Sequence, residues 1–179
     1  MGSKGGKSMS WNEKTLIEFE NCLASTNPTP GGGTASAIVL GQAAALCVMV
    51  CKLTIGKEKW QSGWAAAEKA LLVAEEVRLS STVLANNDSA AFDEVMASFR
   101  LPKDTEDQKI QRKLKIDEAT LTAAVVPHKT AKLALKLLST MTELARFGNG
   151  NAITDIGVAA LLADASCKGA IFNVQINLT

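Results

Sequence analysis

The most continuous apolar run in the chain lies between Asn27 and Trp60, where prolines and a glycine triplet precede a stretch of small and apolar residues. A helix that is apolar on every side is usually buried in a soluble protein, so residues 34–55 predict a central helix with Thr34 at its start. A membrane span of about 20 apolar residues is the alternative. Alanine and glycine stand where such a span is rich in leucine and phenylalanine, so we expect protein to surround this helix.

Apolar residues recur at helical spacing through most of the remaining chain. The pattern predicts further helices near residues 10–25, 58–100, 105–126, 128–147 and 154–173. The helix at 58–100 is either continuous or divided near Asn86, Asn87 and Asp88. These elements predict an all-α fold, a compact bundle of about five or six helices around the buried apolar helix at 34–55.

Caps and helix breakers set the boundaries of these elements. Ser10 and Thr105 each begin a capping-box spacing, which is typical of a helix start. Pro127 is expected to break or kink the helix that contains it. Gly56 is placed to end the central helix, and the glycines and asparagines of residues 148–151 predict a turn.

Composition fits one helical domain and limits its partners. The 179 residues suit one domain, and aromatic residues make up only 4%, so we expect a core of alanine, leucine and valine. A net charge of +1 gives no basic surface for nucleic acid.

The four cysteines show neither a disulfide-scaffold density nor a zinc spacing, so we expect a reducing, cytoplasmic setting. The opening MGSKGGKSMS is typical of an expression-tag remnant over residues 1–9, which leaves 10–179 as the domain.

Several positions are candidates for chemistry, although each also has a structural explanation. A glycine run before a helix lets a ligand touch the backbone, and the N-terminus of that helix attracts anions. A tight connection between two helices can explain the same glycines without a ligand. Lys57 and Lys59 can pair with a carboxylate or simply aid solubility. Asp88 lies in a polar interruption that is either functional or merely exposed, and Asp155 suits the first turn of a helix without a further role. His128 is a possible acid–base group or an exposed side chain, and one histidine with scattered cysteines predicts no metal site.

Taken in order, several segments resemble the successive motifs of the formiminotetrahydrofolate cyclodeaminase/methenyltetrahydrofolate cyclohydrolase family. They are PTPGGGTASA, KLTIGKEKW, DSAAF, FRLPKDTEDQKIQR, VVP, FGNGNAITDIGVAA and NVQINL, and together they cover nearly the whole native chain. The resemblance implies a compact all-helical domain that forms a homodimer or part of a larger assembly. It also implies a tetrahydrofolate derivative as substrate, no metal and no covalently bound cofactor. Relatives commonly continue past the NVxINL segment, which implies that a C-terminal helix is missing here.

The resemblance also assigns candidate site residues. It places the glycine-rich loop of the family on Pro30, Gly31, Gly32 and Gly33, its basic residues on Lys57, Lys59 and Arg112, and its two aspartates on Asp88 and Asp155. Relatives can carry leucine at the position of His128, which removes that histidine from the candidates.

The reaction implied by the resemblance is the closure of 5-formiminotetrahydrofolate to 5,10-methenyltetrahydrofolate with release of ammonia. This reaction needs at least one positioned acid–base group, for which Asp88 and Asp155 are the candidates. An aspartate needs burial or a like-charged neighbour to act near neutrality. We expect Lys57, Lys59 and Arg112 to hold the glutamate tail of the folate. Hydrolysis of methenyltetrahydrofolate to 10-formyltetrahydrofolate is the alternative, and a non-catalytic helical assembly module is a second one.

Overall fold

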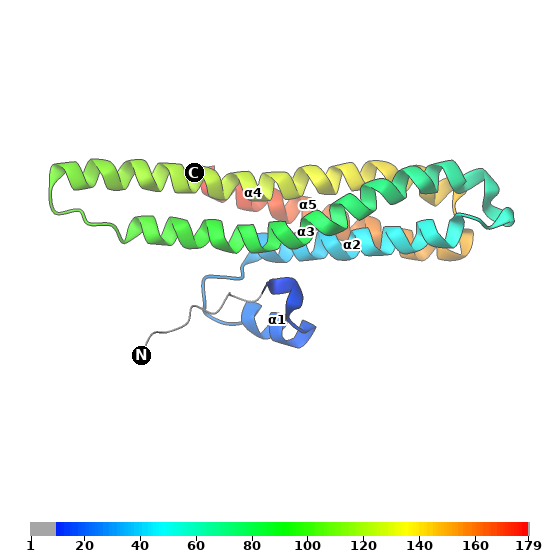
Figure 1. The fold of residues 1–179 in the computed structure, drawn as a ribbon, viewed down its shortest axis with the longest axis horizontal. Coiled ribbons are helices and arrows are strands. Elements are labelled where there is room, and N and C mark those ends of the chain that lie inside the picture. The colour runs from blue at the N-terminus through cyan, green and yellow to red at the C-terminus, as the bar shows by residue number, and fades with distance from the viewer. Residues whose placement is uncertain (1–9, 179) are drawn as a thin grey trace.

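The computed structural model describes residues 10–178, which form five α-helices and three short 3-10 turns. The helices are α1 (Leu16–Leu23), α2 (Gly32–Thr54), α3 (Trp64–Phe99), α4 (Glu106–Phe147) and α5 (Ile153–Leu178), and the 3-10 turns are η1 (Trp11–Glu13), η2 (Glu58–Gly63) and η3 (Gly150–Ala152). Helices α2 to α5 run side by side as an elongated bundle, and the short α1 lies on one side of it (Figure 1). The all-α prediction is confirmed. The expression-tag prediction for residues 1–9 lies outside the described residues.

Helix α2 is one of the buried helices of the core, because it packs closely against α3 and α5 and makes a smaller contact with α4. Small residues allow a close approach between α2 and α5. A Cβ on Gly169 would lie 2.5 Å from Oγ of Ser36, so any side chain at position 169 would force the Ser36 hydroxyl to move. At the same contact, Oγ of Ser166 donates a hydrogen bond of 2.7 Å to the carbonyl of Ser36. The predicted buried apolar helix is therefore confirmed, and its small residues allow α5 to pack closely on it.

The burial of α2 leaves one strip of the helix exposed. Leu40 and Ala44 are fully buried, whereas Gln42, Met49 and Leu53 are exposed. The helix is long and apolar enough to cross a membrane by length and composition, yet 56% of its most hydrophobic window is buried inside the bundle. This burial fits the predicted core helix, and the exposed strip is the feature that an all-round apolar pattern did not indicate.

The N-terminal segment differs from the single helix predicted for residues 10–25. The capping box of Ser10 closes only the single turn η1, since the Ser10 backbone N–H donates to Oε2 of Glu13 at 3.0 Å. Thr15 begins α1 with a second capping box, in which the Glu18 backbone N–H donates to Oγ1 of Thr15 at 3.3 Å. Two capping boxes in quick succession thus divide the segment into two short elements.

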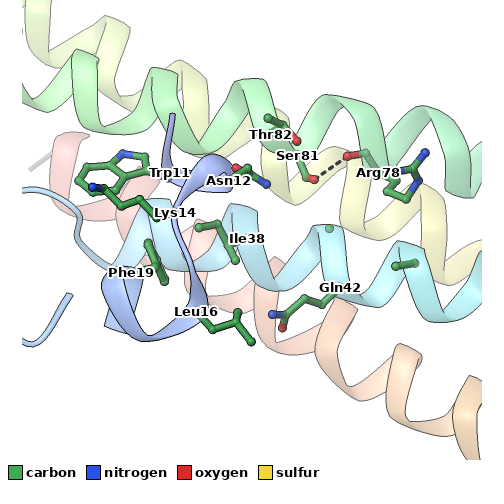
Figure 2. Close-up of a pocket in the computed structure, with 12 residues that line it drawn as sticks. Trp11, Asn12, Lys14, Leu16, Phe19, Ile38, Gln42, Arg78, Ser81 and Thr82 are labelled. Atoms are coloured by element: carbon green, nitrogen blue, oxygen red, sulfur yellow. Dashed lines mark hydrogen bonds between the residues drawn. The ribbon is translucent and has the colours of Figure 1, made fainter. Parts of the chain in front are cut away.

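The η1–α1 segment lies across α2 and α3 and encloses a hollow of about 310 Å³ with them (Figure 2). The rings of Trp11 and Phe19 meet edge to face with centroids 6.2 Å apart, and Ile38 of α2 lines the same hollow. Asn86 of α3 holds the segment, because its Oδ1 accepts from the Trp11 backbone N–H at 3.0 Å and its Nδ2 donates to Oγ of Ser10 at 2.7 Å. The polar interruption in α3 therefore binds the N-terminal segment, and α3 remains one helix.

Helix α4 continues through Pro127, so the predicted break at this proline is wrong. Pro127 is fully buried, and α4 packs on both α3 and α5, which offsets the roughly 3 kcal/mol that a proline costs inside a helix. Because proline has no N–H, the carbonyl of Ala123 lacks its usual helical donor. Asn177 of α5 replaces that donor, since its Nδ2 donates to the Ala123 carbonyl at 3.3 Å. The two helices predicted at 105–126 and 128–147 are therefore one.

Other helix boundaries are close to the predicted ones. Helix α2 begins at Gly32 with Gly31 as its N-cap, so Thr34 lies in the first turn rather than at the cap. Gly56 follows the helix with a φ of 75°, a left-handed conformation that glycine adopts without strain. Helix α5 continues to Leu178, beyond the end predicted near residue 173. The glycine run therefore forms the first turn of α2 rather than a separate loop.

Candidate functional site

The N-terminus of α2 meets the middle of α3 at Gly33 and Asp88. Glycine at position 33 leaves room for the Asp88 carboxyl group, because a Cβ there would lie 2.7 Å from Cγ of Asp88. The Asp88 carboxylate therefore lies against the first turn of α2, where backbone N–H groups lack helical acceptors. The partial positive charge of a helix N-terminus stabilises an anionic group at this position. Two of the predicted site elements, the glycine run and the first aspartate, are thus in contact.

Asp88 is half-buried, and Thr34 holds one of its oxygens. The Thr34 hydroxyl donates to Oδ2 of Asp88 at 2.9 Å. Burial raises the pKa of Asp88 above its usual value, and hydrogen bonds from the side chain and backbone of Thr34 oppose that shift. Desolvation is the larger effect, so Asp88 holds its proton to a higher pH than an exposed aspartate. This change suits a group that accepts a proton in one step and returns it in the next.

A cleft of about 170 Å³ opens beside Asp88. Its lining consists of Pro28, Thr29, Gly31, Gly32, Gly33, Asp88, Phe92, Ala123, Asn173 and Asn177. Phe92 lies one helical turn after Asp88 and is 37% exposed, so its ring offers an apolar surface to a ligand. Pro30 is buried next to this lining and is joined to Thr29 by a cis peptide bond. The cleft thus combines exposed backbone, an aromatic ring and a carboxyl group.

Asn173 and Asn177 reach the cleft from α5 with the orientation of their amides fixed. Nδ2 of Asn173 donates to the Gly169 carbonyl at 2.8 Å. Nδ2 of Asn177 donates to the carbonyls of Asn173 and Ala123, at 2.8 and 3.3 Å. A carbonyl only accepts hydrogen bonds, so each amide nitrogen must face these partners and each Oδ1 must point the other way. No donor within residues 10–178 is hydrogen-bonded to either Oδ1, so both oxygens are acceptors available to a ligand.

Lys57 and Lys59 lie at the opposite end of the bundle from Asp88. They follow the C-terminus of α2, whereas Asp88 contacts its N-terminus. A rise of 1.5 Å per residue separates Gly33 from Thr54 by about 32 Å. Both lysines are exposed. Within one chain, the predicted glutamate-binding lysines therefore do not reach the Asp88 cleft.

Asp155 lies at the same far end, in the first turn of α5. Helix α5 runs antiparallel to α2, because Nδ2 of Asn149 donates to the Leu53 carbonyl at 3.0 Å while Asn173 lies beside Gly32. The helical rise between residues 155 and 173 is about 27 Å. Within one chain, the structure does not bring the two predicted acid–base residues together.

Arg112 lies in the second turn of α4, where α3 and α4 form a hairpin that projects beyond α2 and α5 (Figure 1). Its Nε and Nη2 donate to the Phe99 carbonyl at 3.3 and 3.0 Å. The guanidinium carbon also lies 5.6 Å from the centroid of the Phe99 ring. Arg112 therefore caps the end of α3 and holds the hairpin together, and it does not line the Asp88 cleft.

The remaining candidates for metal chemistry are dispersed. His128 is exposed on α4, while Cys47 and Cys51 are buried in the core. Across residues 10–178, no group of three or more histidine, cysteine, aspartate or glutamate side chains is placed to hold a metal ion.

Residue-by-residue reasoning missed four side chains at this site: Thr34, Phe92, Asn173 and Asn177. A signal existed for the asparagines, because a spacing of four residues places both amides on one face of a helix. They also lie in the NVQINL segment that carries part of the family resemblance. The contact of Thr34 with Asp88 depends on how α2 packs on α3, which no local pattern indicates.

Comparison with known proteins relates the chain to folate enzymes. A family model described as Formiminotransferase-cyclodeaminase matches residues 15–179. The chain is 41% identical over 169 residues to methenyltetrahydrofolate cyclohydrolase from Methylorubrum extorquens, covering 94% of this chain and 81% of the relative. It is 30% identical over 173 residues to formimidoyltransferase-cyclodeaminase from Rattus norvegicus, covering 97% of this chain. The aligned part is 32% of the rat protein, so the chain spans about a third of that relative.

A solved structure is similar over the same range. The crystal structure of formiminotetrahydrofolate cyclodeaminase from Thermotoga maritima matches with a TM-score of 0.82 at 32% identity. The match covers 93% of this chain and 79% of the other. It confirms the helical bundle, and the family model confirms the resemblance first indicated by the sequence motifs. The chain therefore belongs to the formiminotransferase-cyclodeaminase family, a family of folate one-carbon enzymes.

Proposed function

We propose that the protein is a methenyltetrahydrofolate cyclohydrolase, which opens 5,10-methenyltetrahydrofolate to 10-formyltetrahydrofolate in the Asp88 cleft. The observation that carries this proposal is the half-buried Asp88 carboxyl group, which contacts a helix N-terminus and lines a cleft with two free amide oxygens. Similarity supports hydrolysis, since the 41% identical relative from Methylorubrum extorquens carries that name and the alignment covers most of both chains.

Hydrolysis needs one group that accepts a proton and later returns it. Asp88 accepts a proton from water while the water oxygen bonds to the methenyl carbon. The bond from that carbon to N5 then breaks, and Asp88 gives its proton to N5. The remaining hydroxyl proton leaves to solvent, and the formyl group stays on N10. Burial supports this cycle because it raises the pKa of Asp88, so the carboxyl group can hold the proton between the two steps.

The other walls of the cleft suit a pterin ring. The backbone of Gly31–Gly33 carries no side chains, so a flat ring can lie close to it. Phe92 offers an aromatic surface to the same ring. Asn173 and Asn177 present their Oδ1 atoms to the N–H groups at the edge of the ring, which need acceptors once water is excluded. The methenyl ring is cationic, so the ionised form of Asp88 also attracts the substrate.

Cyclodeamination is the second candidate reaction at the same site. It is supported by the similarity to the cyclodeaminase from Thermotoga maritima and to the rat formimidoyltransferase-cyclodeaminase. In this reaction N10 attacks the carbon of the protonated formimino group, and Asp88 accepts the N10 proton. Asp88 then returns that proton to the departing NH2 group, so that ammonia leaves and the methenyl cation remains. Both reactions require the same single proton carrier, so the substrate that turns over distinguishes them.

The proposal includes a homodimer. Lys57, Lys59 and Asp155 lie far from the cleft within one chain, and a second chain running antiparallel along the bundle would bring its own copies of them to Asp88. Large exposed apolar side chains on the α3–α4 hairpin and on α5 support such an association. Those more than half exposed include Ile110 (56%), Leu114 (56%), Leu121 (60%), Phe172 (68%) and Ile176 (72%).

Absorbance of the methenyl compound tests the assignment. A cyclohydrolase accelerates the loss of near-ultraviolet absorbance from added 5,10-methenyltetrahydrofolate above the rate in buffer. A cyclodeaminase generates the same absorbance from 5-formiminotetrahydrofolate. If purified protein changes neither rate, the protein is a non-catalytic helical module and the proposal is wrong.

A further inference from the structure

A continuous hydrogen-bond chain connects the N-terminal segment to Asp88. Nε1 of Trp11 donates to Oγ of Ser89 at 2.9 Å. The hydroxyl oxygens of Ser89 and Thr34 lie 2.9 Å apart, and the Thr34 hydroxyl donates to Oδ2 of Asp88, also at 2.9 Å. These three hydrogen bonds join η1, α3 and α2. They make the polar interruption of α3 part of the site.

Each proton in this chain can be assigned to one bond. An ionised carboxylate only accepts, so the single hydroxyl hydrogen of Thr34 is directed at Asp88. Ser89 must then donate its own hydrogen to Thr34. The indole N–H of Trp11 is a donor only, and it supplies Ser89. The chain therefore runs in one direction, and each donor polarises the next along it.

We propose that Trp11 is a positioning residue for Asp88, which acts through Ser89 and Thr34 to orient the carboxylate and to favour its ionised form. The catalytic consequence rests on the proposed function of Asp88. Ser89 is 6% exposed and Thr34 is fully buried, so water cannot readily replace a donor that is removed. Trp11 also lies before residue 15, where the match to the family model begins.

Among the described residues, no neighbouring charged side chain determines the protonation of Asp88. The side chains that α2, α4 and α5 contribute to the cleft carry no charge. Asp93, on the same helix as Asp88, pairs with Oγ1 of Thr29 at 3.4 Å. Lys14 of the N-terminal segment lies 5.8 Å from the centroid of the Trp11 ring. Burial and hydrogen bonding are thus the effects that set the protonation of Asp88.

The structure allows the indole N–H to be removed without releasing the segment. Asn86 holds the backbone of Trp11 independently of the ring. A phenylalanine at position 11 keeps an aromatic ring beside Phe19 and removes the N–H donor. Trp64→Phe is a matched control, because Nε1 of Trp64 donates to the Lys57 carbonyl at 3.3 Å, at the opposite end of the bundle.

The test is a titration of the Asp88 carboxyl carbon by NMR in protein labelled with carbon-13 aspartate, with Asp88→Asn used to assign the signal. Thr34→Val is expected to raise the pKa of Asp88 by about one unit, because a donor to the charged form is lost. Ser89→Ala and Trp11→Phe should raise it by successively smaller amounts, since polarisation changes each bond by only about 10–30%. The acid limb of the pH–rate profile should move to higher pH in the same variants. Trp64→Phe should leave both the carboxyl titration and the pH–rate profile unchanged.

Titration curves for Trp11→Phe and Ser89→Ala that coincide with the wild-type curve would overturn the proposal, as would an equal shift in Trp64→Phe. If Trp11→Phe does not fold, Ser89→Ala alone supplies the answer, because it breaks the chain at its middle. The carboxyl titration does not depend on turnover. A protein that shows the graded shifts but no folate reaction would keep the positioning role and refute the proposed function.

Discussion

Gly33 and Asp88 touch across the α2–α3 interface with no room for a methyl group, since a Cβ on Gly33 would lie 2.7 Å from Cγ of Asp88. Gly33→Ala should therefore displace the carboxylate while the helices remain formed. A displacement of about 1 Å can cost about 100-fold in rate, and we expect a loss of that order in turnover. Circular dichroism should show unchanged helix content. Gly157→Ala is the control, because its Cβ would meet nothing within 4 Å, and near-normal turnover in Gly33→Ala would contradict this contact.

The protonation of Asp88 predicts an unusual stability profile for Asp88→Asn. Burial raises the pKa of Asp88, so the folded protein binds this proton more tightly than the unfolded chain. At a pH below the usual pKa of 3.8, Asp88 is protonated in both the folded and the unfolded protein, and its contribution to the stability of the fold is fully present. This contribution is lost as the pH rises through the pKa of Asp88 in the folded protein. Asparagine does not titrate, so the Asp88→Asn variant does not lose this stability as the pH rises. Its stability relative to wild type should therefore be higher at pH 7 than at pH 3.5.

Urea unfolding of both proteins across this range measures the difference directly. The sign of the trend is the informative quantity, because replacing the carboxyl group also changes its contact with Thr34 at every pH. A relative stability of Asp88→Asn that falls between pH 3.5 and pH 7 would mean that the pKa of Asp88 is lowered by folding, not raised.

Asn173 should contribute to substrate binding through its free Oδ1. Asn173→Ala removes an acceptor from the cleft and leaves a buried N–H group of the ligand unpaired, which costs about 1–3 kcal/mol. KM for methenyltetrahydrofolate should then rise about tenfold or more, with a smaller effect on kcat. Gln175→Ala is the matched control, since Gln175 is exposed on the same helix and does not line the cleft. Equal KM values for the two variants would remove Asn173 from the binding site.

A composite site between two chains predicts complementation between inactive variants. Asp88→Asn and Asp155→Asn should each be inactive alone. If Asp88 of one chain works with Asp155 of the other, unfolding and refolding an equal mixture restores one intact site in each mixed dimer, which is about a quarter of wild-type activity. No recovery in the mixture would contradict a site shared between two chains, and full activity of Asp155→Asn alone would show that this aspartate is not needed.

The fold class could be predicted from the sequence because local signals and packing agree. The alanine-rich run at 34–55 and the turn at 148–151 are where the pattern placed them. Pro127 shows the limit of local rules. Its penalty inside a helix is real, but burial between neighbouring helices and the bond from Asn177 to the Ala123 carbonyl depend on contacts that a sequence pattern does not contain.

The candidate site was only partly predictable for a similar reason. The glycine run and Asp88 were identified by resemblance, and the structure brings them into contact. Lys57 and Asp155 were identified in the same way, yet the antiparallel course of α2 and α5 places them at the other end of the bundle. Resemblance shows which residues belong to a family pattern, whereas the assignment of residues to one cleft requires the geometry of the helices.

The most direct test of the central role of Asp88 compares wild type with Asp88→Asn on 5,10-methenyltetrahydrofolate, followed by the decay of its near-ultraviolet absorbance. Wild type should hydrolyse the compound faster than buffer. Asp88→Asn should lose about 100- to 10,000-fold of that acceleration, the range typical of a general acid–base group. A folded Asp88→Asn protein that hydrolyses the compound at the wild-type rate would contradict the assignment of this carboxyl group as the proton carrier.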